Sequence, residues 1–274
     1  MLTRLNLTVV LSLLFLLSAA PSAAQDREPE LQAYTFVSQA GFAGAIWDNP
    51  AAGGFNRMTR LVGAITFDRP EAGDWEAGQY SVGLQSGAIS FGYRHDEFSG
   101  MEGFAQGDAY TVAAGIGQGA SAIGVSRTWR SVGPSDGSWE IGTIARSASG
   151  ISAGFVWRDI GSPDVRGVRR RERLIGALTY RGQNSPFAVS LQADYEKDGG
   201  RFRALRIGGN YLLAGTVNAL ALAQWDGDGD FDGFRIGALI RLGKTLGLGG
   251  AGLSAGGDAR TASAGLAHET PKVP

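Results

Sequence analysis

The chain has 274 residues, no cysteine and a formal net charge of −1 at pH 7. The lack of cysteine excludes disulfide bonds and thiolate metal sites, and the near-neutral charge gives no electrostatic basis for binding nucleic acid. Glycine is the outlier, with 43 residues, roughly twice the usual fraction.

Residues 1–24 have the features of a secretory signal peptide. Arg4 precedes a largely apolar stretch, residues 5–20, and the small residues Ser22 and Ala24 follow in positions that signal peptidase accepts. We expect cleavage before Gln25. The alternative is an uncleaved membrane anchor, which the shortness of the apolar stretch disfavours.

Residues 25–55 are expected to form a separate segment, since they are followed by a long run of alternating sequence. The segment ends in WDNPAAGGF, from Trp47 to Phe55. In this motif Asn49 before Pro50 favours an extended backbone followed by a turn, and four small residues come next.

From Leu61 onwards apolar residues alternate with polar or small ones, which is typical of β-strands with one apolar face. The pattern is clearest between Phe187 and Tyr195. No later stretch has 18 or more consecutive apolar residues, so no transmembrane helix is expected. The alternation predicts fourteen strands, or twelve if the two glycine-rich strands at the end are discounted. Their centres lie near Ile65, Val82, Phe91, Val112, Val125, Ile141, Phe155, Leu178, Leu191, Ile207, Leu220, Ala238, Leu248 and Ala264.

Long and short connections alternate along the whole series of strands. Residues 95–108 and 159–172 are long and polar, whereas the turns at residues 86–87 and 118–119 are tight. A soluble sandwich does not require this asymmetry, but a transmembrane barrel does, with short periplasmic turns and long outer loops. We therefore predict an all-β, closed antiparallel transmembrane barrel over residues 56–268, with a tail at residues 269–274, in the outer membrane of a Gram-negative-type bacterium.

Aromatic residues gather near the long connections and, less densely, near the short ones. Two belts of this kind mark the interfaces of a membrane barrel, although strand ends of soluble β proteins carry aromatics too. Arg127 conflicts with the pattern, because it falls on the same face as Val125 and Trp129. Either its side chain extends to the rim or the strand contains a bulge.

The parity of the strands predicts which side chains line the lumen. Charged and polar residues face inwards near the strand ends, and small or apolar residues do so in the middle. Such an apolar waist indicates a plugged lumen, a passage for apolar or amphipathic molecules, or simply a narrow packed interior. The predicted polar lining residues are Arg94, Arg130, Glu140, Arg146, Arg158, Arg181, Gln192, Asp194, Glu196, Arg206, Arg235 and Arg241.

The stretch AGFAGAIWDNPAAGGF resembles the N-terminal segment of the FadL-like outer-membrane proteins, in which Asn-Pro-Ala stands just before the first barrel strand. The resemblance implies a fourteen-stranded barrel that passes hydrophobic compounds, with the N-terminal segment folded inside as a hatch. Other members of that superfamily are carriers in protein secretion. The hatch and hinge residues that it implies are Trp47, Asn49, Pro50, Ala51, Gly53 and Gly54.

Catalysis and cofactor binding have little support in the sequence. His95 and His268 are the only histidines and have no identified nucleophile, so we expect no enzyme and no cofactor. Asp228, Asp230 and Asp232 match the first half of a calcium loop, but Leu239 stands where a bidentate Glu is needed. A solvated hairpin loop is the alternative for these aspartates.

The arginine-rich outer loop, residues 166–173, invites a lipid interaction. Its guanidinium groups would suit the phosphates of lipopolysaccharide, and the alternative is a solubilising loop. For the whole chain, two functions remain. The first is passive transport of a small hydrophobic ligand, and the second is a plugged structural or carrier barrel that binds a protein partner.

Overall fold

The computed structural model describes residues 35–39, 44–55, 58–69, 74–96, 107–130, 137–165, 168–213, 216–254 and 260–271. The expected signal peptide and the start of the N-terminal segment, residues 25–34, lie outside these ranges. Within them, no helix has the length and apolar character needed to cross a bilayer.

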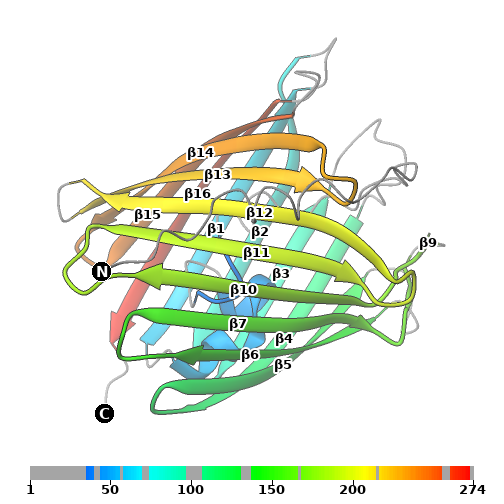
Figure 1. The fold of residues 1–274 in the computed structure, drawn as a ribbon, viewed down its shortest axis with the longest axis horizontal. Helices are drawn as coiled ribbons and strands as arrows, with labels where there is room; N and C mark the ends of the chain where they lie inside the picture. Colours follow the sequence, from blue (N-terminus) through cyan, green and yellow to red (C-terminus); the bar gives the residue numbers. More distant parts are fainter. Residues whose placement is uncertain are drawn as a thin grey trace, which may run out of the picture.

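Fourteen antiparallel strands close into one barrel (Figure 1), with β1 paired to β16. The predicted fold class is confirmed, with fourteen strands rather than twelve. Two short helical turns, η2 (Gly44–Asp48) and η3 (Pro50–Phe55), precede the barrel. The strands are β1 (Met58–Arg69), β2 (Glu76–Ser86), β3 (Ile89–Asp96), β4 (Gly107–Gln118), β5 (Ser121–Arg130), β6 (Ser138–Arg146), β7 (Ile151–Ile160), β10 (Arg173–Arg181), β11 (Phe187–Glu196), β12 (Arg201–Leu212), β13 (Val217–Asp226), β14 (Phe231–Leu242), β15 (Thr245–Ser254) and β16 (Arg260–Pro271).

Two details differ from the sequence prediction. The long loop after β7 contains a small hairpin, β8 (Asp164–Val165) and β9 (Val168–Arg169), which is too short for any alternation to reveal. The last strand also extends past residue 268, so residues 269–271 belong to the barrel wall and not to a tail. Glu269 holds this end in place, because it is 3% exposed and forms ion pairs with Arg60 and Arg241.

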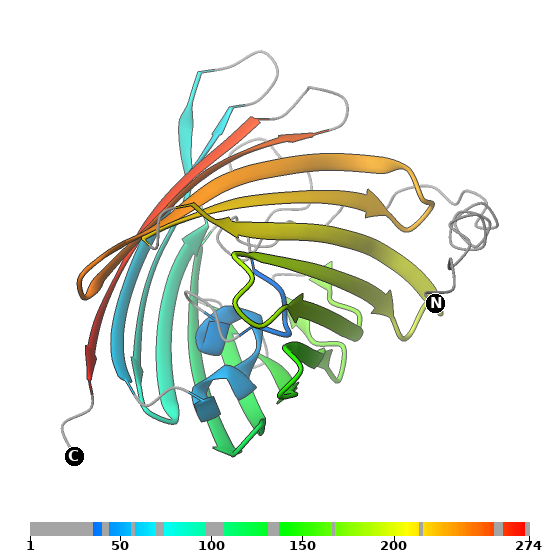
Figure 2. The same cartoon turned by 60° about the vertical axis from the view of Figure 1, so that its left-hand side comes forward.

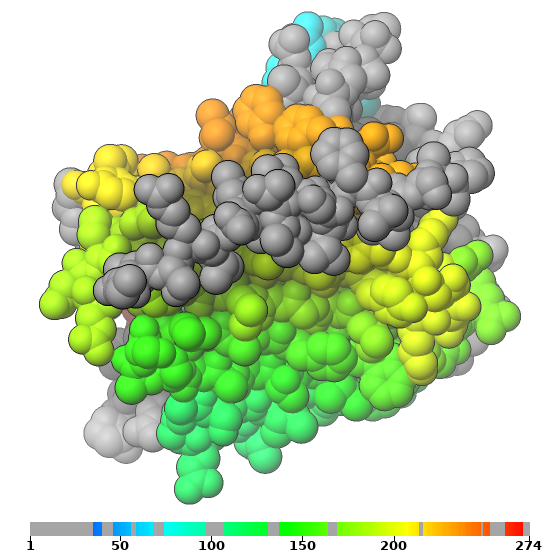
Figure 3. Space-filling model, in the orientation of Figure 1, coloured from blue at the N-terminus to red at the C-terminus, as the bar shows by residue number. Residues whose placement is uncertain are grey.

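The outer surface of the barrel carries large apolar side chains on nearly every strand. In β4, β5 and β6, exposed or half-buried residues of the outer face alternate with buried or half-buried residues of the inner face through the middle of the strand. In the face that Figure 3 shows, the strands from green to yellow form one continuous wall. An apolar surface of this extent is the kind that membrane hydrocarbon covers, so the barrel spans a membrane. Representative exposed residues are Leu84, Phe91, Ile116, Ile123, Leu178, Leu191, Ile236 and Leu266.

The pairing of β5 resolves the conflict at Arg127. Both ladders of this strand run through Arg127 without a shift in register, opposite Val112 on one side and Trp139 on the other. A bulge is therefore excluded, and the side chain stays on the outer face at the long-loop end. Register shifts occur elsewhere, between Trp139 and Ile141 among other places, and each lies near a long loop.

Candidate functional site

The described part of the N-terminal segment lies inside the barrel (Figure 2), where η2 and η3 appear in blue within the ring of strands. We call its described residues, 35–39 and 44–55, the plug. The turn η3 packs against β4, β5 and β6, and Pro50 to Gly53 are buried there. Phe55 ends η3 beneath the guanidinium of Arg146, which lies 4.2 Å from the ring centre at the short-turn end of β6. The end of η3 therefore lies at the short-turn end of the lumen.

A row of inward glycines makes room for the plug. A Cβ atom added to Gly124 would lie 2.3 Å from the carbonyl carbon of Pro50, and one added to Gly154 would lie 2.1 Å from the carbonyl oxygen of Val37. Such distances are far below van der Waals contact, so only glycine fits while the plug stays where it is. The high glycine content thus has a structural cause in this row. Its members are Gly83, Gly92, Gly115, Gly117, Gly124, Gly142, Gly154 and Gly208.

Three apolar clusters join the plug to the barrel wall, and each combines plug residues with wall residues. Ile46 and Trp47 pack with Val62, Leu246 and Ala267, whose strands close the barrel. The second cluster joins Phe36 and Val37 to the wall, and the third does the same for Ala51 and Ala52. The wall residues of these two clusters are Val156, Ile175, Ala177 and Leu222 in the second, and Ala122 and Ile144 in the third.

Asn49 connects the plug to itself and to the wall. Its Nδ2 donates to the carbonyl oxygens of Val37 at 2.7 Å and Thr143 at 3.0 Å, and its Oδ1 accepts from the N–H of Ala51 at 3.0 Å. The side chain is fully buried. Because a buried amide must have partners, this set of bonds specifies both the turn and its place on the wall.

Further polar wall residues hold the plug backbone. Arg158 Nη2 donates to the carbonyl oxygens of Trp47 at 3.0 Å and Asp48 at 3.2 Å, and its Nε lies 3.0 Å from Oε1 of Glu140. Two strands further along the wall, in β11, Gln192 Oε1 accepts from the N–H of Val37 at 3.0 Å. Of the twelve predicted lining residues, Arg146, Arg158 and Gln192 therefore contact the plug directly.

Most of the other predicted lining residues pair with neighbouring side chains of the wall or of the adjoining loops. Asp194 accepts from Arg173 at 3.0 Å, and Arg206 Nε donates to Gln224 at 3.0 Å. The remaining placements are Arg94 with Asp96, Glu196 with Arg171 and Arg201, Arg181 with Asn210, Arg241 with Glu269, Arg130 buried in the wall of β5, and Arg235 beside Gly252.

Sequence reasoning missed several buried charged residues of the interior, among them Arg60, Asp159 and Arg173. Arg60 shares the inward parity of Val62, so the alternation contained the signal for it. Arg173 was expected in a lipid-facing loop, but it points inwards and is 5% exposed. Asp159 turns inwards next to Arg158, with a φ of 54°. A parity rule cannot anticipate this, since the register shift between β6 and β7 falls at this pair, where two residues of β7 face one of β6.

The aspartate loop is organised as a turn. Asp228, Asp230 and Asp232 are all described, and no group of three acidic or histidine side chains in the described chain is arranged to hold a metal ion. Instead, Asp226 Oδ1 accepts from the N–H groups of Asp228 and Asp230 at 3.0 and 2.9 Å, as in an Asx turn. The half-match to a calcium loop thus reflects turn chemistry.

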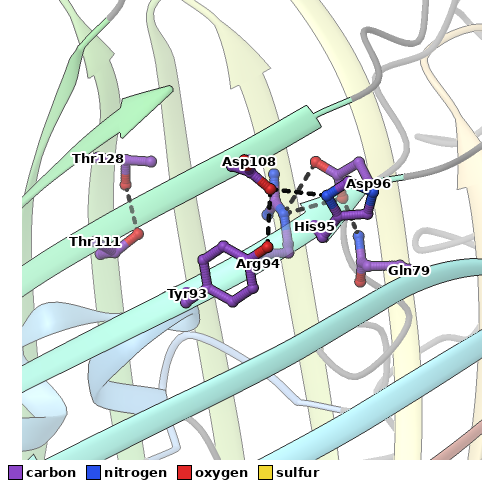
Figure 4. A network of polar contacts seen from close by, with 8 residues as sticks. All are labelled: Gln79, Tyr93, Arg94, His95, Asp96, Asp108, Thr111 and Thr128. Carbon is purple, nitrogen blue, oxygen red and sulfur yellow. Dashed lines mark hydrogen bonds and ion pairs between the residues drawn. The ribbon is translucent and has the colours of Figure 1, made fainter. Parts of the chain in front are cut away.

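A polar network ties β2, β3 and β4 together at the long-loop rim (Figure 4). His95 Nδ1 lies 2.7 Å from Oδ1 of Asp108, which also accepts from the hydroxyl of Tyr93 at 2.8 Å. On the same outer side, the ring of His95 stacks on Tyr80. The neighbouring residues of opposite parity point inwards, where Asp96 accepts from Gln79 at 2.7 Å. These contacts join neighbouring strands, so the network stabilises the rim of the barrel.

The loop carboxylate of Glu172 gathers three donors outside the membrane span. Trp157 Nε1, the Lys197 ammonium group and the N–H of Gly161 approach its oxygens at 3.0, 2.7 and 3.0 Å. The hydrogen bond from Lys197, followed by the one from Gly161, lowers the pKa of Glu172 below its ordinary value of 4.5. The contacts stabilise the charged carboxylate, which ties the loop after β9 to the turn after β11.

This loop contact is expected to weaken in acid. A carboxyl group whose pKa is lower in the folded state stabilises that state above its unfolded pKa, and the contribution is lost as pH falls through the folded pKa. The ¹³C carboxyl resonance of Glu172 in detergent micelles should titrate below the ordinary range, and Lys197→Met should raise its midpoint. Equal midpoints in the two proteins would contradict the assignment of Lys197 as the main cause.

Comparison with known proteins gives relatives by fold only. No family model and no curated protein sequence matches the chain. Among solved structures, the outer membrane protein Omp33 of Acinetobacter baumannii aligns with a TM-score of 0.55 at 6% identity, over 79% of this chain and 100% of that one. The chain has the fold of an outer-membrane β-barrel. A mutant of the Rhodopseudomonas blastica porin aligns less well, with a TM-score of 0.47 at 11% identity, over 77% and 99% of the two chains.

Proposed function

We propose that this chain is an outer-membrane barrel that passes small apolar or amphipathic molecules and that its own plug closes the passage at rest. The observation that supports this most directly is the distribution of side chains in the lumen. The plug meets the wall through three apolar clusters, and several charged pairs lie towards the two ends of the barrel. A molecule that replaced the plug would meet the apolar wall residues of these clusters.

The proposed location is the outer membrane of a Gram-negative-type bacterium, with lipopolysaccharide among the surrounding lipids. The apolar outer surface, the alternation of tight and long connections and the predicted export signal support it. A FadL-like relationship is part of the proposal. It rests on Asn49, Pro50 and Ala51, and the inside position of these residues agrees with the hatch that the resemblance implies.

The close fit of the plug favours a second candidate, a structural or carrier barrel that stays closed. A Cβ on Gly54, for example, would lie 2.6 Å from the carbonyl carbon of Ile116, so the plug and the wall touch backbone to backbone. In that case the outer loops would bind a protein partner and nothing would pass through the lumen.

A liposome flux assay separates the two functions. We expect the wild-type barrel to pass octanoate but to exclude arabinose, and Gly54→Leu, which displaces η3, to pass both solutes. Gly63→Leu is the matched control, because a Cβ there meets nothing within 4 Å. If octanoate crosses only through Gly54→Leu, the barrel is a closed one and the transport proposal fails.

A further inference from the structure

We propose that Arg127, held between Trp129 and Trp139 on the outer surface of the barrel, binds the phosphate group of a membrane lipid in the leaflet next to the long loops. This site is separate from the lumen and does not depend on the proposed transport. It adds a specific lipid contact to a wall that is otherwise apolar at this height.

The register of β5 places the arginine on the lipid side. Ile123 and Val125 precede it on the same face and are 50% and 40% exposed. The ladder to β6 sets Arg127 opposite Trp139 without a shift, and β5 ends three residues later at Arg130. The guanidinium therefore lies at the level where the wall changes from aliphatic to aromatic, which is the level of lipid headgroups.

Two indole rings fix the position of this guanidinium. Its central carbon lies 5.1 Å from the ring centre of Trp129 and 5.0 Å from that of Trp139. Cation–π contacts of this kind orient and stabilise a guanidinium. They leave the positive charge in place, since the rings have no net charge. The clamp presents a cation without neutralising it.

Three buried arginines of the inner face each have a carboxylate partner. Arg60 pairs with Glu269, Arg158 with Glu140 and Arg173 with Asp194, all on the inner face. No carboxylate among the described residues pairs with Arg127, and its buried Nε has no hydrogen-bond partner there. An anion from the lipid phase is the ligand that this environment lacks.

A lipid phosphate fits this requirement chemically. The guanidinium presents a planar fork of donors that matches phosphate oxygens, and charge-assisted bonds of this type are among the stronger ones in proteins. The indole rings on either side suit the boundary between headgroups and acyl chains.

The arginine-rich outer loop is a weaker candidate for this role. Arg173 faces the lumen, and Arg171 forms an ion pair with Glu196, an inward carboxylate that is 3% exposed. Lys197 over Trp157 resembles the clamp at Arg127 in geometry, but its ammonium group is already bound by Glu172. These cations therefore stabilise the protein's own carboxylates.

Native mass spectrometry of the folded barrel in detergent tests the site directly. The probes are diphosphoryl lipid A and its dephosphorylated form, together with phosphatidylglycerol and diacylglycerol. We expect Arg127→Gln to weaken binding of the phosphorylated lipids about tenfold or more. Arg127→Lys should give an intermediate loss, because it keeps the charge and removes the fork. Lys244→Gln, an exposed cation in a tight turn at the opposite end, is the control and should leave binding unchanged.

The pattern of binding decides the outcome. Preference for diphosphoryl lipid A identifies lipopolysaccharide as the source of the phosphate, and preference for phosphatidylglycerol identifies a glycerophospholipid. Both results support the site only if Arg127→Gln abolishes the preference. Equal binding of phosphorylated and dephosphorylated lipids, or equal binding by wild type and a correctly folded Arg127→Gln, overturns it. Heat-modifiable gel migration of each variant verifies the fold.

Discussion

Gly124→Val is expected to displace the plug from the barrel while the barrel itself remains closed. A Cβ at this position would lie 2.3 to 2.5 Å from three backbone atoms of Pro50 and Ala51, none of which has a side-chain rotation that relieves the clash. Overpacking of this kind costs about 1–3 kcal/mol. The strand itself favours a β-branched residue, so the wall is expected to retain its ladder and the plug to move.

The absence of cysteine makes this displacement straightforward to measure. Ala52→Cys introduces a single thiol at a position that is 2% exposed in the plug. Combining it with Gly124→Val should raise the rate of maleimide labelling about tenfold to a hundredfold, in line with the overpacking energy. Gly63→Val is the control, because it adds the same side chain to a glycine with nothing within 4 Å. Equal labelling with and without Gly124→Val would show that the plug does not press on β5.

The sequence predicted most of the wall because the alternation is a local property. In β11, the parity read between Phe187 and Tyr195 corresponds to the alternating burial in the barrel. The glycine-rich strand β15 has no comparable alternation of large side chains, and the regular sequence of long and tight connections was the better guide to it. It pairs along its whole length with β14 and β16.

The interior was harder to predict because its contacts join residues far apart in the chain. Parity assigns Gly142 to the inner face, but it does not show that the plug backbone and the Asn49 amide lie against that face. Nor does it show that Arg158 binds the carbonyl groups of Trp47 and Asp48, more than a hundred residues earlier in the chain. Such partners are set by closure of the barrel around the segment.

Asn49→Asp is expected to release the plug at neutral pH more completely than Asn49→Ala does. The amide donates to the carbonyl oxygens of Val37 and Thr143, and a third, of Phe155, lies 3.5 Å away. Alanine loses these bonds at a cost of about 1–3 kcal/mol. An ionised aspartate would in addition place a negative charge, with acceptor atoms only, against three carbonyl oxygens in a site with no exposure to solvent.

The pH dependence of Asn49→Asp distinguishes this mechanism from a general loss of stability. Burial beside carbonyl oxygens disfavours the charged form, so the pKa of the introduced carboxyl group would be higher with the plug docked than with it released. Such a carboxyl group stabilises the docked plug at pH values below the pKa that it has when the plug is released. This stabilisation is lost as the pH rises through the higher pKa that it has when the plug is docked. Labelling through Ala52→Cys should therefore fall as the solution is acidified in Asn49→Asp but not in Asn49→Ala.

The control Asn184→Asp changes an exposed turn residue and should label like the parent at every pH. If Asn49→Asp and Asn49→Ala label alike across the pH range, the side chain of Asn49 does not hold the plug through its donor group.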